Sequence, residues 1–425
     1  MARQFQRRDG ILHCEDVSIP ELVAQHGTPL YVYSRTAIVQ RYRELADALS
    51  GVPLLIAYSV KANGNLEVLR TLAGLGGGAD IVSAGELYRA RLAGIPGDRL
   101  VFSGVGKTVT ELAAALDEGI YGFNVESEGE LRALSDLAEA TGKRARISLR
   151  VNPDVDTPTP HAYTRTGHAA TKFGIPIEDS HRLYALAGEL PGIEVRGVDV
   201  HIGSQILEVD PYRRALEQVL ELVATLRGEG HDLEYLDLGG GLGISYTGEE
   251  GISAQVFADA VVPAVRECGL KLVIEPGRYI VGPAGILVTR VLYIKQGGGK
   301  RFVITDAGMN DLLRPSHYSG YHAVEPVETF GRPHGRVDVV GPICETGDFL
   351  ALDREVELTE PGELLAIRTT GAYGFSMSST YNQRPRPAEI MVEGDQVTLA
   401  RRRETIQDLV AAELLDRGGK EEELR

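Results

Sequence analysis

The chain has 425 residues, 43% of them hydrophobic, and its 60 acidic and 44 basic side chains give a formal net charge of −16. This length exceeds that of a typical single domain and predicts a large domain accompanied by a second one. The acidic balance argues against non-specific binding of nucleic acid, because phosphate contacts need clustered cations. An anionic ligand must therefore meet a few locally placed arginines.

The cysteine content and the hydropathy of the chain indicate its cellular compartment. Cys14, Cys268 and Cys344 are far apart in the chain, and such an odd, sparse set favours a reducing cytoplasm over a disulfide framework. The basic N-terminal segment is not followed by the apolar core of a signal peptide, and no apolar run is long enough to span a membrane. We expect a cytoplasmic protein that binds neither membranes nor nucleic acid.

Along the chain, a short strand-like piece at 29–34 is followed by an alternation of apolar runs and amphipathic stretches. The longest amphipathic stretch, 211–230, repeats apolar residues at three- and four-residue spacing, as a helix on a sheet requires. Strands that alternate with helices pair in parallel, and eight of them predict a (β/α)8 TIM-type barrel, with a doubly wound open sheet as the alternative. The eight predicted strands lie at 53–60, 79–83, 99–104, 121–127, 145–152, 195–202, 234–239 and 271–276.

The pattern changes after Pro283. Apolar residues now alternate in twos, and Gly, Pro and charged turns separate the runs, which predicts an antiparallel β domain of sandwich-like or barrel-like form. We assign residues 30–282 to the barrel and residues 1–29 with 283–425 to the β domain. The segment 403–425 has the pattern of a helix followed by a charged end.

Chemistry on such a barrel lies at the C-terminal ends of its strands. Lys61 follows the first predicted strand and is either a solvated lysine or a lysine that forms a Schiff base with an aldehyde cofactor. For the second role, partial desolvation at the barrel mouth would lower its pKa. His201 and Ser204 follow the sixth strand. The histidine is either a structural hydrogen-bonding group or a ring that stacks on an aromatic cofactor, with the serine hydroxyl near a phosphate.

A glycine cluster, Gly239, Gly240, Gly241 and Gly243, follows the seventh strand. Backbone without Cβ atoms can approach an anion closely, and barrel phosphate sites commonly lie after strands seven and eight. The alternative is an ordinary glycine-rich turn. The spacing does not match the G-x-G-x-x-G pattern of dinucleotide sites. The sequence predicts no metal site.

The eighth strand is followed by Glu275, Gly277 and Arg278. A carboxylate buried at a strand end is costly unless it is paired, and beside a pyridine nitrogen it would keep that nitrogen protonated, which makes the ring a strong electron sink. The arginine suits bidentate binding of a carboxylate. The alternative is a surface ion pair between the two side chains.

The β domain adds further polar candidates. Arg314 and Tyr318 lie in a predicted loop, and Cys344 and Glu345 lie in a turn. Cys344 is either a reactive thiol or a small buried hydrophobic residue, the more common state of a free cysteine. Tyr373, in a segment rich in Gly, Ser and Tyr, either faces a ligand or packs in the interior.

Together these segments resemble the fold-type III pyridoxal-phosphate decarboxylases, and among them the diaminopimelate decarboxylases. The resemblance implies that Lys61 holds pyridoxal 5'-phosphate covalently, that His201 stacks on its ring, and that Glu275 pairs with the pyridine nitrogen. It also implies a phosphate site made of Ser204, Gly240, Gly241, Gly243, Gly277 and Arg278. The matching motifs are YSVKAN, GADIVSAGEL, RVNP, TKFGI, HIGSQ, LDLGGGLGI, EPGRYIV, DAGMNDLLRPSHY, GPICETGD and GAYGFSMSSTYN.

The resemblance further implies decarboxylation of meso-2,6-diaminopimelate to L-lysine, the last step of lysine biosynthesis, in a homodimer whose active sites are shared between subunits. Arg278, Arg314 and Tyr318 would bind the carboxylate at the non-reacting end of this amino-acid substrate. Glu345 of the partner chain would bind the distal ammonium, and the partner's Cys344, or Lys61, would supply the proton that replaces CO2. Tyr373 would lie near the cofactor or the substrate.

Alternatives within the fold are decarboxylases of ornithine, arginine or carboxynorspermidine. A substrate with only a distal ammonium would leave the arginines unpaired at a cost of several kcal/mol, and those relatives usually carry Cys-Asp where this chain has Cys344-Glu345. A racemase would place an arginine where this chain has Glu275, and a non-catalytic regulatory protein usually lacks the lysine or the phosphate loop. The departures are small: Thr346 replaces a more common serine, and HAATKFG replaces a Gly-Lys-Ser-Lys type of lead-in.

Overall fold

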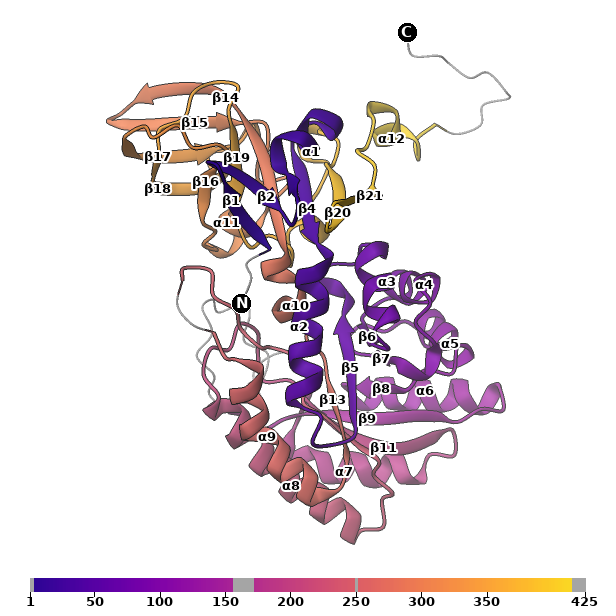
Figure 1. The fold of residues 1–425 in the computed structure, drawn as a ribbon. Helices are drawn as coiled ribbons and strands as arrows, with labels where there is room; N and C mark the ends of the chain where they lie inside the picture. The colour runs from indigo at the N-terminus through magenta and orange to yellow at the C-terminus, as the bar shows by residue number, and fades with distance from the viewer. Residues whose placement is uncertain (1–3, 156–171, 249–250, 415–425) are drawn as a thin grey trace. The chain divides into compact units, whose positions relative to one another are not determined.

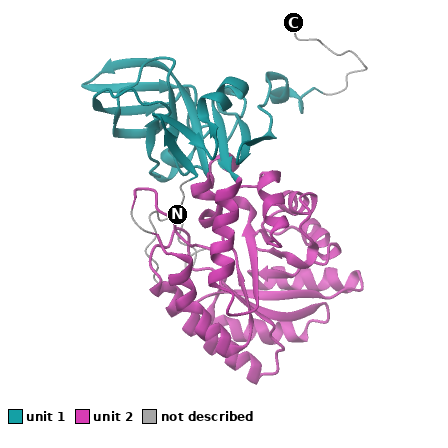
Figure 2. Cartoon of the chain, in the orientation of Figure 1, with its two compact units in different colours: residues 1–34, 285–370, 377–425 teal, residues 35–284, 371–376 magenta. Residues whose placement is uncertain are grey.

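The structure is a computed structural model that describes residues 4–155, 172–248 and 251–414 (Figure 1). The chain forms two compact units (Figure 2). One consists of residues 35–284 and 371–376, and the other of residues 1–34, 285–370 and 377–425.

The barrel unit, which is unit 2 in Figure 2, is a closed parallel barrel. Its strands run in the order β9-β11-β12-β13-β5-β6-β7-β8, and β8 pairs again with β9, which closes the sheet. The predicted TIM-type barrel is therefore confirmed and the open doubly wound sheet is wrong. The strands are β5 (Leu54–Ser59), β6 (Gly78–Ile81), β7 (Leu100–Phe102), β8 (Gly122–Val125), β9 (Ala145–Asn152), β11 (Ile193–Val200), β12 (Tyr235–Asp237) and β13 (Lys271–Ile274), with a short β10 (Ile175–Pro176) added to β9.

The helices of this unit begin where the sequence offers capping groups. Ser83, Thr108, Ser127 and Ser253 each accept a hydrogen bond from a backbone N–H in the first helical turn, which satisfies a donor that has no partner inside the helix. The helices are α2 (Arg35–Ala48), α3 (Leu66–Gly74), α4 (Ala84–Leu92), α5 (Val109–Asp117), α6 (Glu128–Ala140), α7 (Ile177–Glu189), α8 (Asp210–Gly228), α9 (Ala254–Cys268) and α10 (Arg278–Val281).

The barrel interior changes from apolar to polar toward the C-terminal ends of its strands. Val101, Tyr235 and Val273 pack together in an apolar layer. Because side chains on one face of a strand repeat every second residue, the next inward positions are Ser103, Asp237 and Glu275, and all three are buried. The polar groups therefore gather at the end of the barrel where enzymes of this fold place their chemistry.

The β unit, which is unit 1 in Figure 2, is built on a β sheet with the order β18-β17-β15-β14-β4-β20-β21, and β19 pairs with β14 and β16. Most pairings are antiparallel, as predicted, but β15–β17 and β4–β20 are parallel. The strands are β1 (Phe5–Arg8), β2 (Ile11–Cys14), β3 (Val17–Ser18), β4 (Leu30–Ser34), β14 (Gly285–Gly297), β15 (Lys300–Thr305), β16 (Val324–Pro326), β17 (His334–Val340), β18 (Phe349–Glu357), β19 (Leu364–Ile367), β20 (Ala388–Glu393) and β21 (Gln396–Arg401), with helices α1 (Ile19–His26), α11 (Arg314–Tyr318) and α12 (Ile406–Val410).

The division between the units differs from the predicted one at three places: the barrel unit begins at residue 35 and not 30, extends to residue 284 and not 282, and includes residues 371–376. Strand β4 pairs with β14 and β20, so the chain joins the barrel unit after Ser34 and not at residue 30. Residues 371–376 return to the barrel unit, where Asn63 donates to the carbonyl of Gly371 at 3.0 Å. Of the predicted C-terminal helix, only α12 is formed within the described residues, and 415–425 lie outside them.

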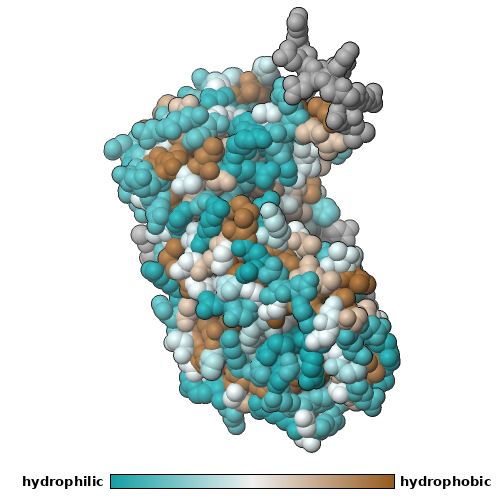
Figure 3. Space-filling model, turned by 90° about the vertical axis from the view of Figure 1, so that its right-hand side faces the viewer, coloured by the Kyte–Doolittle hydropathy of each residue, from teal (hydrophilic) through white to brown (hydrophobic). Residues whose placement is uncertain are grey.

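The hydropathy of the surface and of the helices bears on the expectation that the chain has no membrane-spanning segment. Figure 3 shows hydrophilic residues over much of one face, with hydrophobic residues scattered among them. No helix among the described residues is both long enough and apolar enough to cross a bilayer.

Candidate active site

Lys61 lies in a single 3-10 turn, Val60–Ala62, directly after β5. Its Nζ donates to Oδ2 of Asp80 at 2.7 Å, and the same oxygen accepts the hydroxyl of Ser59 at 2.7 Å. The Asp80 side chain is fully buried, whereas 38% of the Lys61 side chain is exposed. The amine is therefore reachable by a ligand and is held in one direction by a rigid carboxylate.

The charge state of Lys61 differs from the sequence-based expectation of a lowered pKa. Burial acts to lower the pKa, but the neighbouring carboxylate of Asp80, assisted by Glu275, outweighs burial and raises it above the ordinary lysine value. The sequence argument considered desolvation alone. It missed Asp80 because that residue lies on β6, two residues before the end of a short apolar run.

His201 follows β11 and contacts the glycine loop. The backbone N–H of Gly240 donates to His201 Nδ1 at 3.1 Å, so the proton of a neutral ring lies on Nε2. Burial, together with the charges of Arg150 and Lys61, holds the pKa of His201 well below its usual value. A neutral, flat ring at this position is suited to stacking on an aromatic ligand.

The glycine loop after β12 needs its glycines for close packing of backbones. A Cβ atom on Gly240 would lie 2.3 Å from the carbonyl oxygen of Glu275, and one on Gly241, whose φ is +93°, would lie 2.3 Å from the carbonyl oxygen of Gly203. The N–H groups of Gly239 and Gly243 donate to Asp237 and Ile206. The N–H of Gly241 donates to none of the described residues, so it is available for an anion.

Glu275, directly after β13, has only 5% of its surface exposed. One carboxyl oxygen accepts the hydroxyl of Ser103 at 3.0 Å and the amide of Asn124 at 3.1 Å. Burial, followed by the nearby carboxyl of Asp237, raises the pKa of Glu275 well above its usual value. A positively charged partner would therefore be needed to stabilise the ionised form of Glu275.

Arg278 begins α10 and connects three parts of the barrel unit. Its guanidinium donates to the hydroxyl of Tyr246 at 2.8 Å and to that of Ser204 at 3.2 Å. It also lies 4.8 Å from the ring centre of Tyr373. Tyr373 has a φ of +55°, which is strained for an aromatic residue, and its N–H donates to the carbonyl of Ala62 at 2.8 Å.

In the barrel unit these side chains fit an aromatic aldehyde that carries a phosphate. An accessible lysine amine can bind the aldehyde, a buried carboxyl can face a ring nitrogen, and the histidine ring is flat and neutral. For the phosphate, the unit offers the N–H of Gly241, the Ser204 hydroxyl and the Arg278 guanidinium. Gly277 packs against Ala62, where a Cβ would lie 2.8 Å from the Ala62 methyl group.

The remaining residues that were predicted to form the site lie in the β unit. Arg314, the first residue of α11, is buried and donates to Nε2 of His322 at 2.7 Å. His322 in turn donates from Nδ1 to the carbonyl of Arg368, so it is held as the neutral tautomer that accepts from the arginine. Tyr318 ends this helix, partly exposed, where the sequence predicted a loop.

Cys344 and Glu345 lie in an exposed turn. The alternative reading of Cys344 as a buried hydrophobic residue is therefore wrong. Its N–H donates to the side chain of Asn382 at 2.9 Å, and the hydroxyl of Tyr381 donates to the Glu345 carboxylate. Asp348 anchors the turn by accepting the N–H groups of Ile343 and Met309, each at 2.6 Å.

Comparison with known proteins assigns the family. Residues 35–282 match the pyridoxal-binding domain of the pyridoxal-dependent decarboxylases. The chain is 51% identical to a diaminopimelate decarboxylase of Aquifex aeolicus, over 96% of this chain and 97% of that one. The chain belongs to the diaminopimelate decarboxylase family. As a member it is a carboxy-lyase that uses pyridoxal 5'-phosphate.

Other members of the diaminopimelate decarboxylase family agree in sequence and structure. The Pseudomonas aeruginosa enzyme is 50% identical over 97% of this chain and 99% of its own length. The crystal structure of the Helicobacter pylori enzyme complexed with L-lysine has a TM-score of 0.90 and 42% identity, over 93% of this chain and 98% of that one. The fold is thus shared over nearly the whole length.

Sequence reasoning missed the residues that support the site from neighbouring strands. Asp80, Ser103 and Asn124 hold Lys61 and Glu275, and Tyr246 holds Arg278. Gln205 binds both the N–H and the carbonyl of Ile244, which secures the glycine loop. The sequence contains one signal that could have indicated these supporting residues: several polar residues occur at the ends of otherwise apolar strand runs. The lead-in HAATKFG begins in residues that lie outside the described part of the chain.

Proposed function

We propose that this chain decarboxylates meso-2,6-diaminopimelate to L-lysine and CO2, the last step of lysine biosynthesis. The observation that supports this most is an accessible lysine amine, Lys61, at the same end of one barrel as the buried carboxyl of Glu275. In the proposal Lys61 binds the aldehyde, His201 covers the ring, and Glu275 faces the pyridine nitrogen. The near full-length similarity to curated diaminopimelate decarboxylases supports the substrate.

When bound, pyridoxal 5'-phosphate would supply a pyridine ring that accepts electrons. Glu275 would stabilise a proton on the ring nitrogen, because a carboxylate beside that nitrogen favours its charged form. Ser204, Arg278, Gly277 and the loop Gly240–Gly243 would hold the phosphate. Tyr373 packs against the Arg278 guanidinium and keeps it directed toward the site.

In the proposal, residues of the β unit bind the far end of the substrate. That end carries a carboxylate and an ammonium, which match the charges of Arg314 and Glu345. Arg278 and Tyr318 complete the carboxylate site. Because His322 accepts from Arg314 while its own proton is held by a carbonyl, it orients the guanidinium without adding a charge. Ornithine has no distal carboxylate for the arginines to bind, and the loss of that ion pair costs several kcal/mol.

A proton must replace CO2 at the substrate carbon. The C–C bond breaks, CO2 leaves without the electron pair, and an acid delivers H⁺ to the carbon. The exposed thiol of Cys344 and the ammonium form of Lys61 each carry a proton, so each can serve as that acid. We further propose a cytoplasmic homodimer in which Cys344 and Glu345 complete the partner's active site. Three unpaired cysteines favour a reducing compartment.

The test compares Lys61→Ala with Lys143→Ala. Lys143 is a matched control because 39% of its side chain is exposed and its Nζ lies 2.7 Å from Asp117, values close to those of Lys61. We expect the Lys61 variant to lose the visible absorbance of the bound cofactor and to release no CO2, and the control to keep both. A Lys61→Ala protein with full activity would falsify the proposed role.

A substrate panel separates the remaining alternatives. Wild-type protein is supplied with meso-diaminopimelate, ornithine, arginine or carboxynorspermidine, and CO2 release is measured. We expect a tenfold or greater preference for meso-diaminopimelate, because only this compound pairs both distal charges, and a tenfold ratio corresponds to about 1.4 kcal/mol. Faster turnover of any other compound would reassign the substrate, and racemisation without CO2 release would reassign the reaction.

A further inference from the structure

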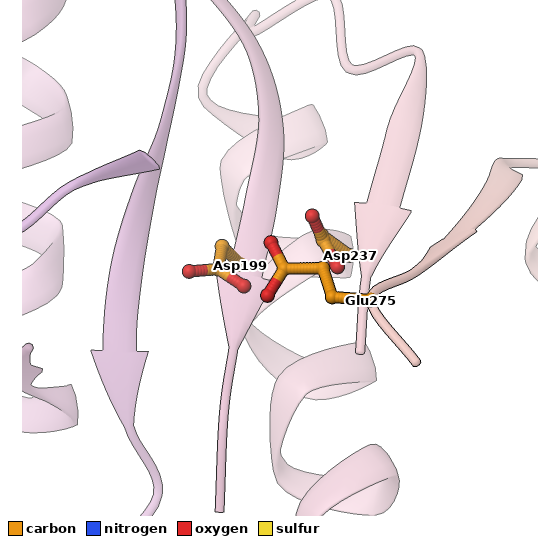
Figure 4. A group of neighbouring side chains, drawn as sticks. All are labelled: Asp199, Asp237 and Glu275. Atoms are coloured by element: carbon orange, nitrogen blue, oxygen red, sulfur yellow. The ribbon is translucent and has the colours of Figure 1, made fainter. Parts of the chain in front are cut away.

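Beneath the proposed cofactor site lies a cluster of three buried carboxyl groups. Asp199 on β11, Asp237 at the end of β12 and Glu275 after β13 each place an oxygen within 4.8 Å of the others. Their exposed fractions are 1%, 0% and 5%. Figure 4 shows the three carboxyl groups gathered between adjacent strands of the barrel.

The charges around this carboxyl cluster do not neutralise three anions. Lys61 is paired with Asp80 at 2.7 Å, and Arg150 is paired with Glu126 at 2.9 Å. Among the described residues, these two cations have the largest effects on the cluster, and each already has a carboxylate partner. A protonated pyridine nitrogen would add one positive charge only. Three buried like charges would therefore be strongly unfavourable, and protons must be retained.

Hydrogen bonds decide which member is most easily protonated. Glu275 accepts from Ser103 and Asn124, and Asp237 accepts the N–H of Gly239 at 2.8 Å. Asp199 Oδ1 is buried and has no partner in the described part of the chain. Donors favour the ionised form of a carboxyl, so Asp199 is the member least able to hold a negative charge.

The surroundings of Asp199 also favour its neutral form. Burial, and then the charge of Glu275, raises the pKa of Asp199 well above its usual value, with Glu126 and Asp80 adding to the effect and Arg150 opposing it. Burial and the neighbouring Asp199 raise the pKa of Asp237 to about 8. The positive ring nitrogen of a bound cofactor would lower most strongly the pKa of the carboxyl that faces it, which is Glu275 in the proposed function.

We propose that Asp199 is a neutral carboxylic acid in the holoenzyme and thereby keeps Glu275 as the charged member of the cluster. Asp199 is then a positioning residue that acts through Glu275, and it touches neither substrate nor cofactor. This inference rests on the proposed role of Glu275. It accounts for an aspartate that has no described donor to Oδ1 in the interior of the barrel.

Infrared spectroscopy of the holoenzyme tests the protonation state directly. We expect wild-type protein above pH 8, where Asp237 has lost its proton, to show the carbonyl-stretching band of a protonated carboxylic acid. We expect Asp199→Asn to lose that band while keeping the visible absorbance of the cofactor. A band unchanged in Asp199→Asn would overturn the inference, because Asp199 would then be ionised. Loss of the cofactor absorbance in a folded Asp199→Asn protein would also contradict it, since asparagine has the shape and charge of the neutral acid.

If Asp199→Asn does not fold, a second measurement on wild-type protein tests the same inference. Wild-type holoenzyme with carboxyl-13C-labelled aspartate is examined above pH 8, where Asp237 loses its proton. An isotope-shifted acid band that persists there supports the inference, and its disappearance contradicts it. A stoichiometric metal ion bound without an acid band would likewise overturn it. The band does not depend on turnover, so a protein that shows it without releasing CO2 refutes the proposed function and not the state of Asp199.

Discussion

The most informative single contact is the one between Lys61 and Asp80. The pair lies 2.7 Å apart at the end of the barrel, and the acceptor is fully buried. A charged amine is a poor nucleophile, because addition to an aldehyde requires the lone pair of the neutral form. The carboxylate therefore directs the lysine and at the same time favours its unreactive state until a ligand arrives.

This balance predicts the effect of Asp80→Asn. Removing the negative charge should lower the pKa of Lys61, since an opposite charge at this distance stabilises the ammonium form. A larger fraction of the amine is then neutral at a given pH, so cofactor-free protein should bind pyridoxal 5'-phosphate rapidly at lower pH than wild type. The rate of appearance of the visible absorbance, measured against pH, checks this. Asp117→Asn, which removes the partner of Lys143, serves as the control, and an unshifted profile in Asp80→Asn would contradict the argument.

At the scale of elements, the glycine loop shows that one sequence feature serves two purposes. Its glycines were predicted to expose N–H groups to an anion, but several of these groups bind within the fold. The stronger requirement is steric, because Gly240 and Gly241 pass directly against the backbone of neighbouring strand ends. The loop is held in place by packing, which leaves the N–H of Gly241 for a ligand.

Gly241→Ala and Gly248→Ala separate these effects. Both glycines have positive φ, +93° and +105°, but a Cβ on Gly241 meets the carbonyl of Gly203 at 2.3 Å, whereas one on Gly248 meets none of the described residues within 4 Å. Each variant should lose about 1 kcal/mol from backbone strain, and Gly241→Ala should lose about 1–3 kcal/mol more from the clash. Urea denaturation of the cofactor-free proteins measures this. Gly241→Ala should also bind the cofactor at least tenfold more weakly, and equal behaviour of the two variants would refute the steric argument.

The elements themselves were largely predictable. Each of the eight barrel strands lies within about two residues of its predicted position, because apolar runs between amphipathic stretches report burial on both faces of a parallel sheet. The small sheet β1–β3 and helix α1 were not predicted, since their runs are too short to show a period. Helix α11 was taken for a loop because Pro315 and the serines around it resemble turn residues.

At the scale of the whole molecule, the predicted active-site residues divide between two units. Lys61, His201 and Glu275 belong to the barrel unit, and Arg314 and Cys344 belong to the β unit. A site that needs both sets draws on segments far apart in the chain. In the proposed dimer, the turn that carries Cys344 completes the active site of the other subunit.

Mixing two inactive variants tests this arrangement. Lys61→Ala and Cys344→Ala chains, unfolded and refolded together, should regain at most about a quarter of wild-type activity, because random pairing makes half of the dimers mixed and each mixed dimer has one intact site of two. Specific CO2 release is compared with that of each variant refolded alone. If every site were built from a single chain, the mixture would be no more active than its components.

The sequence by itself determined the barrel and the β domain that follows it, and it singled out Lys61, His201, Glu275 and Arg278 as candidate site residues, because periodicity and strand-end position are local properties. Only the tertiary structure decided what surrounds them. Asp80 opposes the lowered pKa expected for Lys61, and Asp199 and Asp237 crowd Glu275, although these residues are distant in the chain. Charge states in a closed barrel depend on neighbours across strands, and no local pattern records those neighbours.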